Sequence, residues 1–275
     1  FLPLKNLALY VIISILREIM DLSTVLGLVL SVTSISVGDI LEGGNPLHVI
    51  HLSSVLIVIP TAMASAVTAS HASYVKGAYK EFKTAWLASP VNYNETIRQL
   101  VELATLARRD GVLSLEGKAA QIEDDFLRKA ISMIVDGREA EAVEEDMEIQ
   151  IEVLEEYYHG CSHYWERTGE SCPTFGLVGA VMGLMLALGL LEDPVAMAAG
   201  IAGAFTATVT GIFGAYAFFG PIGAKIMAKA KDVIKEKELI VAAVVGIAKG
   251  DNPRNLEEKL LGYIKPGEPK ISQFE

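Results

Sequence analysis

The chain has 275 residues, of which 51% are hydrophobic and 21% are charged, and its formal net charge at pH 7 is −11. This negative charge gives no support to nucleic-acid binding, and a mean hydropathy of +0.38 argues against a secreted or cytosolic globular domain. Four stretches contain no Asp, Glu, Lys or Arg: residues 22–38, 43–75, 172–191 and 194–224. Because about 20 apolar residues cross a bilayer as a helix, the sequence predicts an all-α integral membrane protein with four transmembrane helices and a helical cytoplasmic domain.

Residues 1–19 are predicted to be an N-terminal extension of unknown role. Their apolar run over residues 6–16 is too short to span a membrane and is followed by Arg17 and Glu18. A run of this kind fits a signal-like segment, an interfacial helix or sequence upstream of the true start. Met20 and the residues after it look like a natural beginning.

Charged residues divide the rest of the chain into four parts. Residues 20–75 are predicted to hold transmembrane helices 1 and 2, and residues 171–224 helices 3 and 4. Residues 76–170 form a predicted cytoplasmic helical domain, and residues 225–275 a cytoplasmic C-terminal tail. Lysines follow the second and fourth spans, whereas the short connections within each pair of spans carry acids and no Lys or Arg. Because basic residues that flank a span favour the cytoplasmic side, both termini are predicted to be cytoplasmic.

Apolar spacing predicts three helices in the cytoplasmic domain. The first covers residues 96–107 and is broken by an Asp-Gly pair. Ser114 is expected to cap a second helix that runs to about Val135. The third begins near Glu139 and is expected to continue nearly unbroken into the third span.

Small residues recur at every fourth position in the last two spans, a pattern that lets helices approach closely. One interpretation is packing between helices of one subunit, and the other is a face for a second subunit or a partner chain. The long series in the fourth span indicates that this helix packs inside its own subunit and also offers a face to a second subunit or a partner chain. The series is Gly179, Gly183 and Ala187 in the third span, and Ala199, Gly203, Ala207, Gly211 and Ala215 in the fourth.

No acidic or basic residue lies near the middle of any predicted span. Ion-translocating proteins normally keep an ionisable group there, so a carboxylate that carries ions would have to come from another chain. The sequence also holds no nucleotide-binding loop, catalytic triad or metal-ligand cluster, which predicts no enzyme and no cofactor. Cys161 and Cys172 have no metal or redox spacing and are expected to be free thiols.

Three motifs resemble, in order along the chain, those of the flagellar motor stator A subunits, the MotA/PomA family. Residues 107–116 (ARRDGVLSLE) look like the cytoplasmic charged motif of that family. Residues 172–181 (CPTFGLVGAV) are similar to its third-span motif. Residues 196–208 (AMAAGIAGAFTAT), followed by Tyr216 and Pro221, are similar to its fourth-span motif. The likeness covers the whole chain after the N-terminal extension.

The resemblance implies a ring of about five copies in the bacterial cell inner membrane, in contact with lipid and arranged around two single-span B subunits. Each B subunit carries the ion-binding aspartate, which is the carboxylate that the spans of this chain lack. Ion flow through that aspartate turns the ring, and the cytoplasmic loop acts electrostatically on the rotor's switch-complex protein.

The resemblance also assigns roles to single residues. Pro173 and Pro221 match the prolines that shape the ion pathway and couple it to rotation, and Thr208 matches the threonine that faces the partner aspartate. Without the motifs, these residues would be read as structural bends and as a hydroxyl bonded to its own helix, and the cytoplasmic charges as a solvated surface. The charges that match the rotor-contacting set are Arg108, Arg109 and Glu116.

The identity of the ion is inferred from one position in the pathway. Sodium-driven members of the family place a threonine in the third span seven residues after the proline, and here that position is Ala180. Sodium needs several oxygen ligands, as hard cations do, and a methyl group supplies none. The resemblance therefore implies that protons are used.

Two other functions are also compatible with the sequence. One is a proton-driven force generator of the ExbB/TolQ type, which shares the small-residue spans but lacks the extra first span and the charged cytoplasmic motif. The other is a non-transporting membrane scaffold whose small residues only assemble an oligomer.

Overall fold

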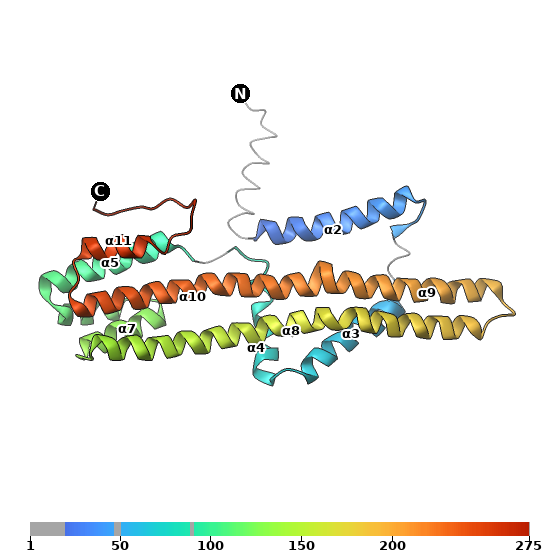
Figure 1. Cartoon of the computed structure of the whole chain (residues 1–275), viewed down its shortest axis with the longest axis horizontal. Coiled ribbons are helices and arrows are strands. Elements are labelled where there is room, and N and C mark those ends of the chain that lie inside the picture. The colour runs from blue at the N-terminus through green and yellow to red at the C-terminus, as the bar shows by residue number, and fades with distance from the viewer. Residues whose placement is uncertain (1–19, 47–50, 89–90, 275) are drawn as a thin grey trace, which may run out of the picture. The chain divides into compact units, whose positions relative to one another are not determined.

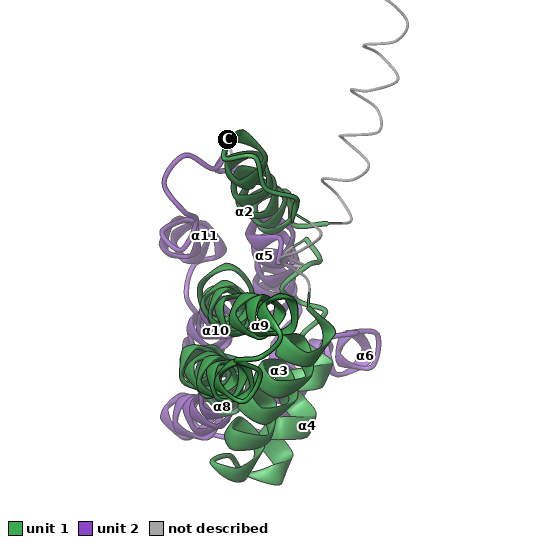
Figure 2. Ribbon diagram, turned by 90° about the vertical axis from the view of Figure 1, so that its right-hand side faces the viewer, with its two compact units in different colours: residues 1–89, 157–229 green, residues 90–156, 230–275 purple. Residues whose placement is uncertain are grey.

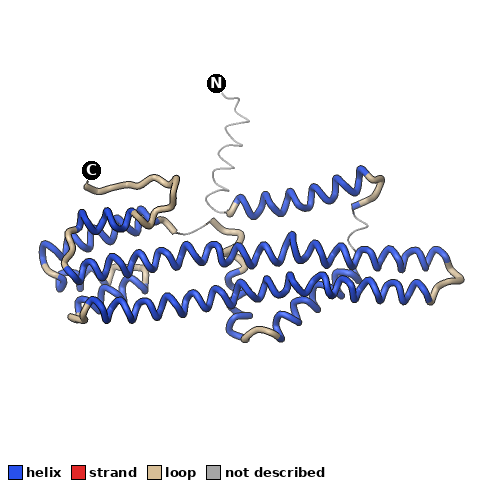
Figure 3. The backbone as a smooth tube through the Cα atoms, viewed as in Figure 1, coloured by secondary structure: helices blue, strands red, loops and turns tan. Residues whose placement is uncertain are grey.

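The computed structural model describes residues 20–46, 51–88 and 91–274, and this part of the chain is built from α-helices (Figure 1, Figure 3). Within it, the β-type pairing is limited to an isolated antiparallel bridge between Met20 and Leu87. The all-α prediction is therefore confirmed. The expected extension over residues 1–19 lies outside the described residues.

The chain divides into two compact units, which Figure 2 shows in different colours. Two of the boundaries fall inside long helices, α8 (Ala140–Leu188) and α10 (Gly220–Lys249), so each of these helices contributes to both units. Unit 1 consists of residues 1–89 and 157–229, and unit 2 of residues 90–156 and 230–275.

Of the helices in the described part of the chain, the most apolar lie in unit 1. Asp21 and Asp193 cap α2 and α9 by accepting backbone N–H groups, and Pro194 stands in the first turn of α9, where no N–H is needed. These caps explain where the two helices begin. The elements are α2 (Leu22–Leu41), α3 (Leu52–Thr68), α4 (Ala72–Glu81), the C-terminal part of α8, α9 (Pro194–Phe213), a π-helical segment (Gly214–Phe219) and the start of α10.

Among the described residues, three helical stretches are long and apolar enough to cross a membrane: Leu22–Leu41, Ala140–Leu188 and Pro194–Lys249. The second predicted span, within residues 43–75, corresponds to α3, a shorter apolar helix of 17 residues. That length is at the lower end of what a bilayer requires.

The prediction that the helix beginning near Glu139 continues into the apolar stretch over residues 172–191 is confirmed, because α8 is one helix of 49 residues. It continues through Gly160, Gly169 and Pro173, although glycine and proline disfavour helix interiors. A β-carbon on Gly160 would be 2.5 Å from the ring of Tyr74, and one on Gly169 would be 3.0 Å from the nitrogen of Gly220. Close tertiary packing therefore requires these glycines and outweighs local helix propensity.

Unit 2 is a small helical domain with its own core. The helix predicted over residues 96–107 is confirmed as part of α5 (Tyr93–Asp110). The other elements are a 3₁₀ turn (Val112–Leu115), α6 (Glu116–Ala119), α7 (Asp125–Val135), α11 (Pro253–Leu261) and the adjoining parts of α8 and α10. Side chains buried in this unit include Ile97, Leu100, Leu127, Ile131, Met147, Leu256 and Leu260.

The single helix predicted from Ser114 to Val135 is wrong, because the chain breaks there into α6 and α7. Asp124 caps α7 by accepting the N–H of Phe126 at 3.0 Å. The Ser114 hydroxyl instead donates to the carbonyl of Gly111 at 2.6 Å. Gly111 has a φ of +85°, which glycine adopts readily and other residues rarely do. The polar side chains therefore stabilise a tight turn after α5 and not the start of a long helix.

Candidate functional site

The predicted site residues form two groups, one in each unit. The first group lies on the apolar helices of unit 1, and the second lies around the end of α5 in unit 2. The first group consists of Pro173, Ala180, Thr208 and Pro221. The second consists of Arg108, Arg109 and Glu116.

α8 and α9 pack against each other through their small residues. A β-carbon on Gly176 would be 3.0 Å from the carbonyl oxygen of Ala207, and one on Gly211 would be 2.6 Å from that of Cys172. Gly176 also lies against the backbone of Thr208, with 3.5 Å between its ideal β-carbon and the Thr208 α-carbon. These contacts occur within one chain, so the prediction of close packing inside a subunit is confirmed.

The expectation that the whole fourth-span series also faces a second subunit is wrong for three of its five positions. Ala207, Gly211 and Ala215 are buried inside this chain. Ala199 is exposed, and a β-carbon on Gly203 would meet nothing within 4 Å. Spacing in the sequence shows that a helix face is smooth but does not show which helix covers it. The first two positions of the series leave room for another chain.

Thr208 lies half-buried in the packed helix pair. Its hydroxyl donates to the carbonyl of Ala204 at 3.3 Å, just as the Thr210 hydroxyl donates to the carbonyl of Thr206 at 2.8 Å. This is the ordinary arrangement of threonine in an apolar helix. A hydroxyl that donates keeps lone pairs, so Thr208 can still accept a hydrogen bond from a protonated carboxyl group.

A hydroxyl pair between α3 and α9 was not predicted from the sequence. Ser54 is 2% exposed, and its Oγ lies 3.0 Å from Thr206 Oγ1 and 3.4 Å from the carbonyl oxygen of Gly203. A buried polar pair between apolar helices fixes their register. The sequence shows a serine near the start of an apolar stretch, but nothing in it pairs residue 54 with residue 206.

Pro173 and Pro221 lie near an irregular part of unit 1. Gly169, one turn before Pro173, packs against Gly220, which directly precedes Pro221. Pro221 follows the π-helical segment Gly214–Phe219, and such segments are rare and widen a helix locally. The predicted bend at Pro221 therefore coincides with irregular backbone, whereas α8 stays α-helical through Pro173.

The structure also shows an ion-pair cluster at the start of α2 that was not predicted from the sequence. It consists of Asp21, Lys225 and Lys229. Asp21 Oδ2 is 2.9 Å from Lys225 Nζ and 3.0 Å from Lys229 Nζ. Lys229 also donates to the carbonyl groups of Thr84 and Leu87, and its side chain is only 10% exposed. The cluster therefore fastens the start of α2 to α10 and to the turn after α4. In the sequence these charges only flank the apolar stretches, and residues so far apart in the chain give no pairing signal.

Burial raises the pKa of the Asp21 carboxyl group, but hydrogen bonds from Ser23, Lys225 and Lys229 outweigh burial and hold the pKa well below its usual value. A carboxyl group with a lowered pKa stabilises the folded state at every pH above its unfolded-state pKa, about 4. This stabilisation is lost as the pH falls through the lower pKa of the folded state.

Replacing Asp21 by asparagine should lower the free energy of unfolding by about 3 kcal/mol, because Lys229 stays buried without its counter-ion. Thermal unfolding of the purified protein in detergent measures this loss. It should stay constant from about pH 8 to about pH 5 and shrink only below about pH 4. Asp193→Asn is the matched control, because Asp193 caps α9 through backbone N–H groups and asparagine caps equally well. Equal losses in the two variants would contradict the importance of the cluster.

The charged motif lies at an exposed corner of unit 2, formed by the end of α5, the following turn and α6. Arg108, Arg109 and Glu116 are all exposed. Arg109 pairs with its neighbour Asp110 at 2.8 Å, and Arg108 donates to the carbonyl of Gly250 at 3.3 Å. Ion pairs at such exposed positions are weak, so these side chains remain available to a partner protein.

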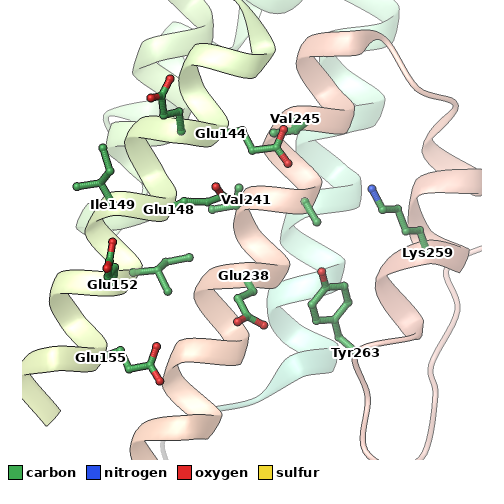
Figure 4. A pocket seen from close by; sticks show the side chains of 13 residues that line it. Glu144, Glu148, Ile149, Glu152, Glu155, Glu238, Val241, Val245, Lys259 and Tyr263 are labelled. Atoms are coloured by element: carbon green, nitrogen blue, oxygen red, sulfur yellow. The ribbon is translucent and has the colours of Figure 1, made fainter. Parts of the chain in front are cut away.

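Unit 2 also has a groove of about 650 Å³ with acidic walls (Figure 4). Most of its carboxylates come from α8, and one comes from α10. In the described part of the chain, no three His, Cys, Asp or Glu side chains are arranged to hold a metal ion. The groove therefore presents a solvated acidic face. The acidic side chains that Figure 4 labels in this groove are Glu144, Glu148, Glu152, Glu155 and Glu238.

The two cysteines are free, as the sequence predicted, and the structure shows that both are buried. Burial raises the pKa of the Cys161 thiol to about 11. Because the thiolate is the reactive form of cysteine, Cys161 is a packing residue and not a redox site.

The chain is similar to bacterial motility proteins over most of its length. It is 66% identical to motility protein A of Helicobacter pylori (strain ATCC 700392 / 26695) over 256 residues, which cover 93% of this chain and 100% of that protein. It is 30% identical to motility protein A of Bacillus subtilis (strain 168), with coverage of 89% and 91%. The chain belongs to the motility protein A family.

Solved structures agree with this membership. The structure of C. jejuni MotAB matches with a TM-score of 0.90 at 60% identity, and covers 93% of this chain and 100% of that one. The flagellar MotAB stator complex from Bacillus subtilis matches with a TM-score of 0.81 at 30% identity, with coverage of 89% and 96%. Residues 118–239 match the MotA/TolQ/ExbB proton channel family. This motility protein A family member is therefore a flagellar stator subunit and a protein of the inner membrane, as the sequence motifs predicted.

Proposed function

We propose that this chain acts with a single-span B subunit to couple proton flow across the inner membrane to torque on the flagellar rotor. The observation that carries the proposal is the match to MotAB over 93% of the chain with a TM-score of 0.90. A B subunit supplies the carboxylate that residues 172–191 and 194–224 lack. The same partner accounts for the open positions of the small-residue series, Ala199 and Gly203.

The proposal includes four membrane spans, cytoplasmic termini and a ring of five copies. α2, α3, the C-terminal part of α8 and α9 are the spans. The distribution of Lys and Arg supports this topology, because the connections at residues 39–46 and 192–194 contain none. In this arrangement unit 2 lies in the cytoplasm, where its exposed charged corner meets the rotor.

In the proposed mechanism, protons load the aspartate of the B subunit beside the packed α8 and α9 pair. Thr208 accepts a hydrogen bond from the protonated carboxyl group, and Ala180 keeps the facing wall apolar. Pro173 and Pro221 shape the helices that border this path. Each elementary charge that crosses supplies about 2.3 kcal/mol per 100 mV, which is enough to bias a ring between states of similar energy.

Proton uptake by proteoliposomes tests this function directly. The chain is purified together with its B subunit, and uptake is measured with a pH-sensitive dye after a membrane potential is imposed. Uptake should require both chains and should disappear when the B-subunit aspartate is replaced by asparagine. No uptake from the intact pair would favour the non-transporting scaffold. Uptake without restored swimming in a stator-deficient host would favour a force generator of the ExbB/TolQ type.

Reversing the charge of Arg108 or Glu116 should reduce torque without affecting proton flow. Both side chains lie on the exposed corner of unit 2, and charges at the edge of an interface set specificity and encounter rate. Swimming speed should fall severalfold in Arg108→Glu and in Glu116→Lys, and a compensating reversal on the rotor protein should restore it. Lys129→Glu is the matched control, because Lys129 is also exposed and lies on α7 of the same unit. Single reversals that abolish proton uptake would contradict the rotor-contact role.

A further inference from the structure

An apolar groove of about 440 Å³ runs between α2, α3 and α9 in unit 1. Its walls include Val32 and Ile35 of α2, Ile59 of α3, and Val209 and Phe213 of α9. α2 forms one side of the groove, and none of its residues is buried. The groove is therefore accessible to small apolar occupants in the membrane, and its volume is in the range of ligand sites.

One end of this groove is polar and negatively charged. Asp39, in the last turn of α2, lines the groove, and its buried Oδ2 atom has no hydrogen-bond partner among the described residues. A buried carboxylate oxygen without a partner is costly near a membrane, so a cationic donor at this position would stabilise it. The connections at residues 39–46 and 192–194 contain acids and no Lys or Arg, so neither of them supplies a permanently charged cation to this end of the groove.

We propose that this groove binds a membrane phospholipid with a primary ammonium headgroup, whose ammonium pairs with Asp39 and whose acyl chain fills the groove. An occupant that is apolar along its length and cationic at one end matches the lining. The acidic end disfavours a headgroup with a net negative charge. Thr208, Pro173 and Pro221 do not line the groove, so the proposed lipid site uses none of the residues assigned to the ion pathway.

A photoactivatable phosphatidylethanolamine with a diazirine on its acyl chain tests the proposal. The chain, co-purified with its B subunit, is placed in nanodiscs that contain this probe or the phosphatidylglycerol probe with the same acyl chains. Peptides are then analysed by mass spectrometry. The ethanolamine probe should label peptides of α2 and α9, and at least fivefold more strongly than the glycerol probe.

Two pairs of variants separate the groove from the general bilayer surface. Asp39→Asn and Val32→Trp should each lower labelling by the ethanolamine probe at least fivefold. Glu42→Gln and Val29→Trp are the matched controls, because both residues are exposed and neither lines the groove, so labelling should stay unchanged. Elution of each complex at the wild-type volume on size-exclusion chromatography shows that the variants are folded.

Equal labelling by the two probes would overturn the proposal, as would full labelling of both Asp39→Asn and Val32→Trp. A cysteine placed at Val32 that cross-links to a second copy or to the B subunit would also overturn it, because a protein would then occupy the groove. Labelling is measured without ion flow, so its outcome is separate from the test of proton uptake.

Discussion

Replacing Gly211 by leucine is expected to abolish swimming by preventing α8 and α9 from packing. The β-carbon alone would lie 2.6 Å from the carbonyl oxygen of Cys172 and 3.1 Å from the α-carbon of Gly176. Both neighbours are backbone atoms, so the helices must separate to admit any side chain. Overpacking of this kind costs about 3 kcal/mol or more, and it falls on the helix pair that carries Thr208. The amount of folded protein extracted from membranes should drop severalfold together with swimming.

Gly203→Leu provides the matched comparison, because Gly203 is on the same helix and a β-carbon there would meet nothing within 4 Å. This variant should fold and be extracted normally. Loss of swimming in Gly203→Leu with normal folding would show that this part of α9 contacts another chain. Normal folding of Gly211→Leu would contradict the role assigned to the packed pair.

Local signals in the sequence predict most of the helices of this protein. The charge-free stretch that begins at Pro194 predicts the start of α9, and the lack of a strong breaker after Glu139 predicts that α8 continues into the next apolar stretch. The helix predicted from Ser114 fails because Ser114 and Asp124 are both good cap residues, and spacing does not decide which of them caps the longer helix.

The contacts between distant segments could not be predicted in the same way. The pairing of Asp21 with Lys225 and Lys229 depends on how the chain returns to the start of α2. The five small residues of the fourth span predict a smooth face, but their partner within the chain depends on the rotation of α9 about its axis. The site residues followed from motifs of a known family, and the groove beside Asp39 has no sequence motif.

The choice of ion in our proposal follows from the oxygen ligands that the proposed pathway offers. Thr208 contributes one hydroxyl, which already donates to the carbonyl of Ala204. Ala180, one turn beyond the Gly176 that packs against Thr208, contributes only a methyl group. A dehydrated sodium ion needs several oxygen ligands at once, as hard cations do. A proton needs only water and one carboxylate, so this pathway suits protons.

Swimming of cells that rely on this stator should therefore stop within seconds of adding a protonophore and should not respond to external sodium. The measurement is swimming speed while sodium chloride is exchanged for choline chloride at constant ionic strength and pH. A sodium-driven stator in the same host is the control, because its speed should follow sodium and resist the protonophore at first. Ala180→Thr should not create sodium dependence by itself, since one added hydroxyl still leaves the ion short of ligands. Speed that follows sodium at a fixed proton gradient would show that other oxygen atoms complete the ligand set and that protons are not the coupling ion.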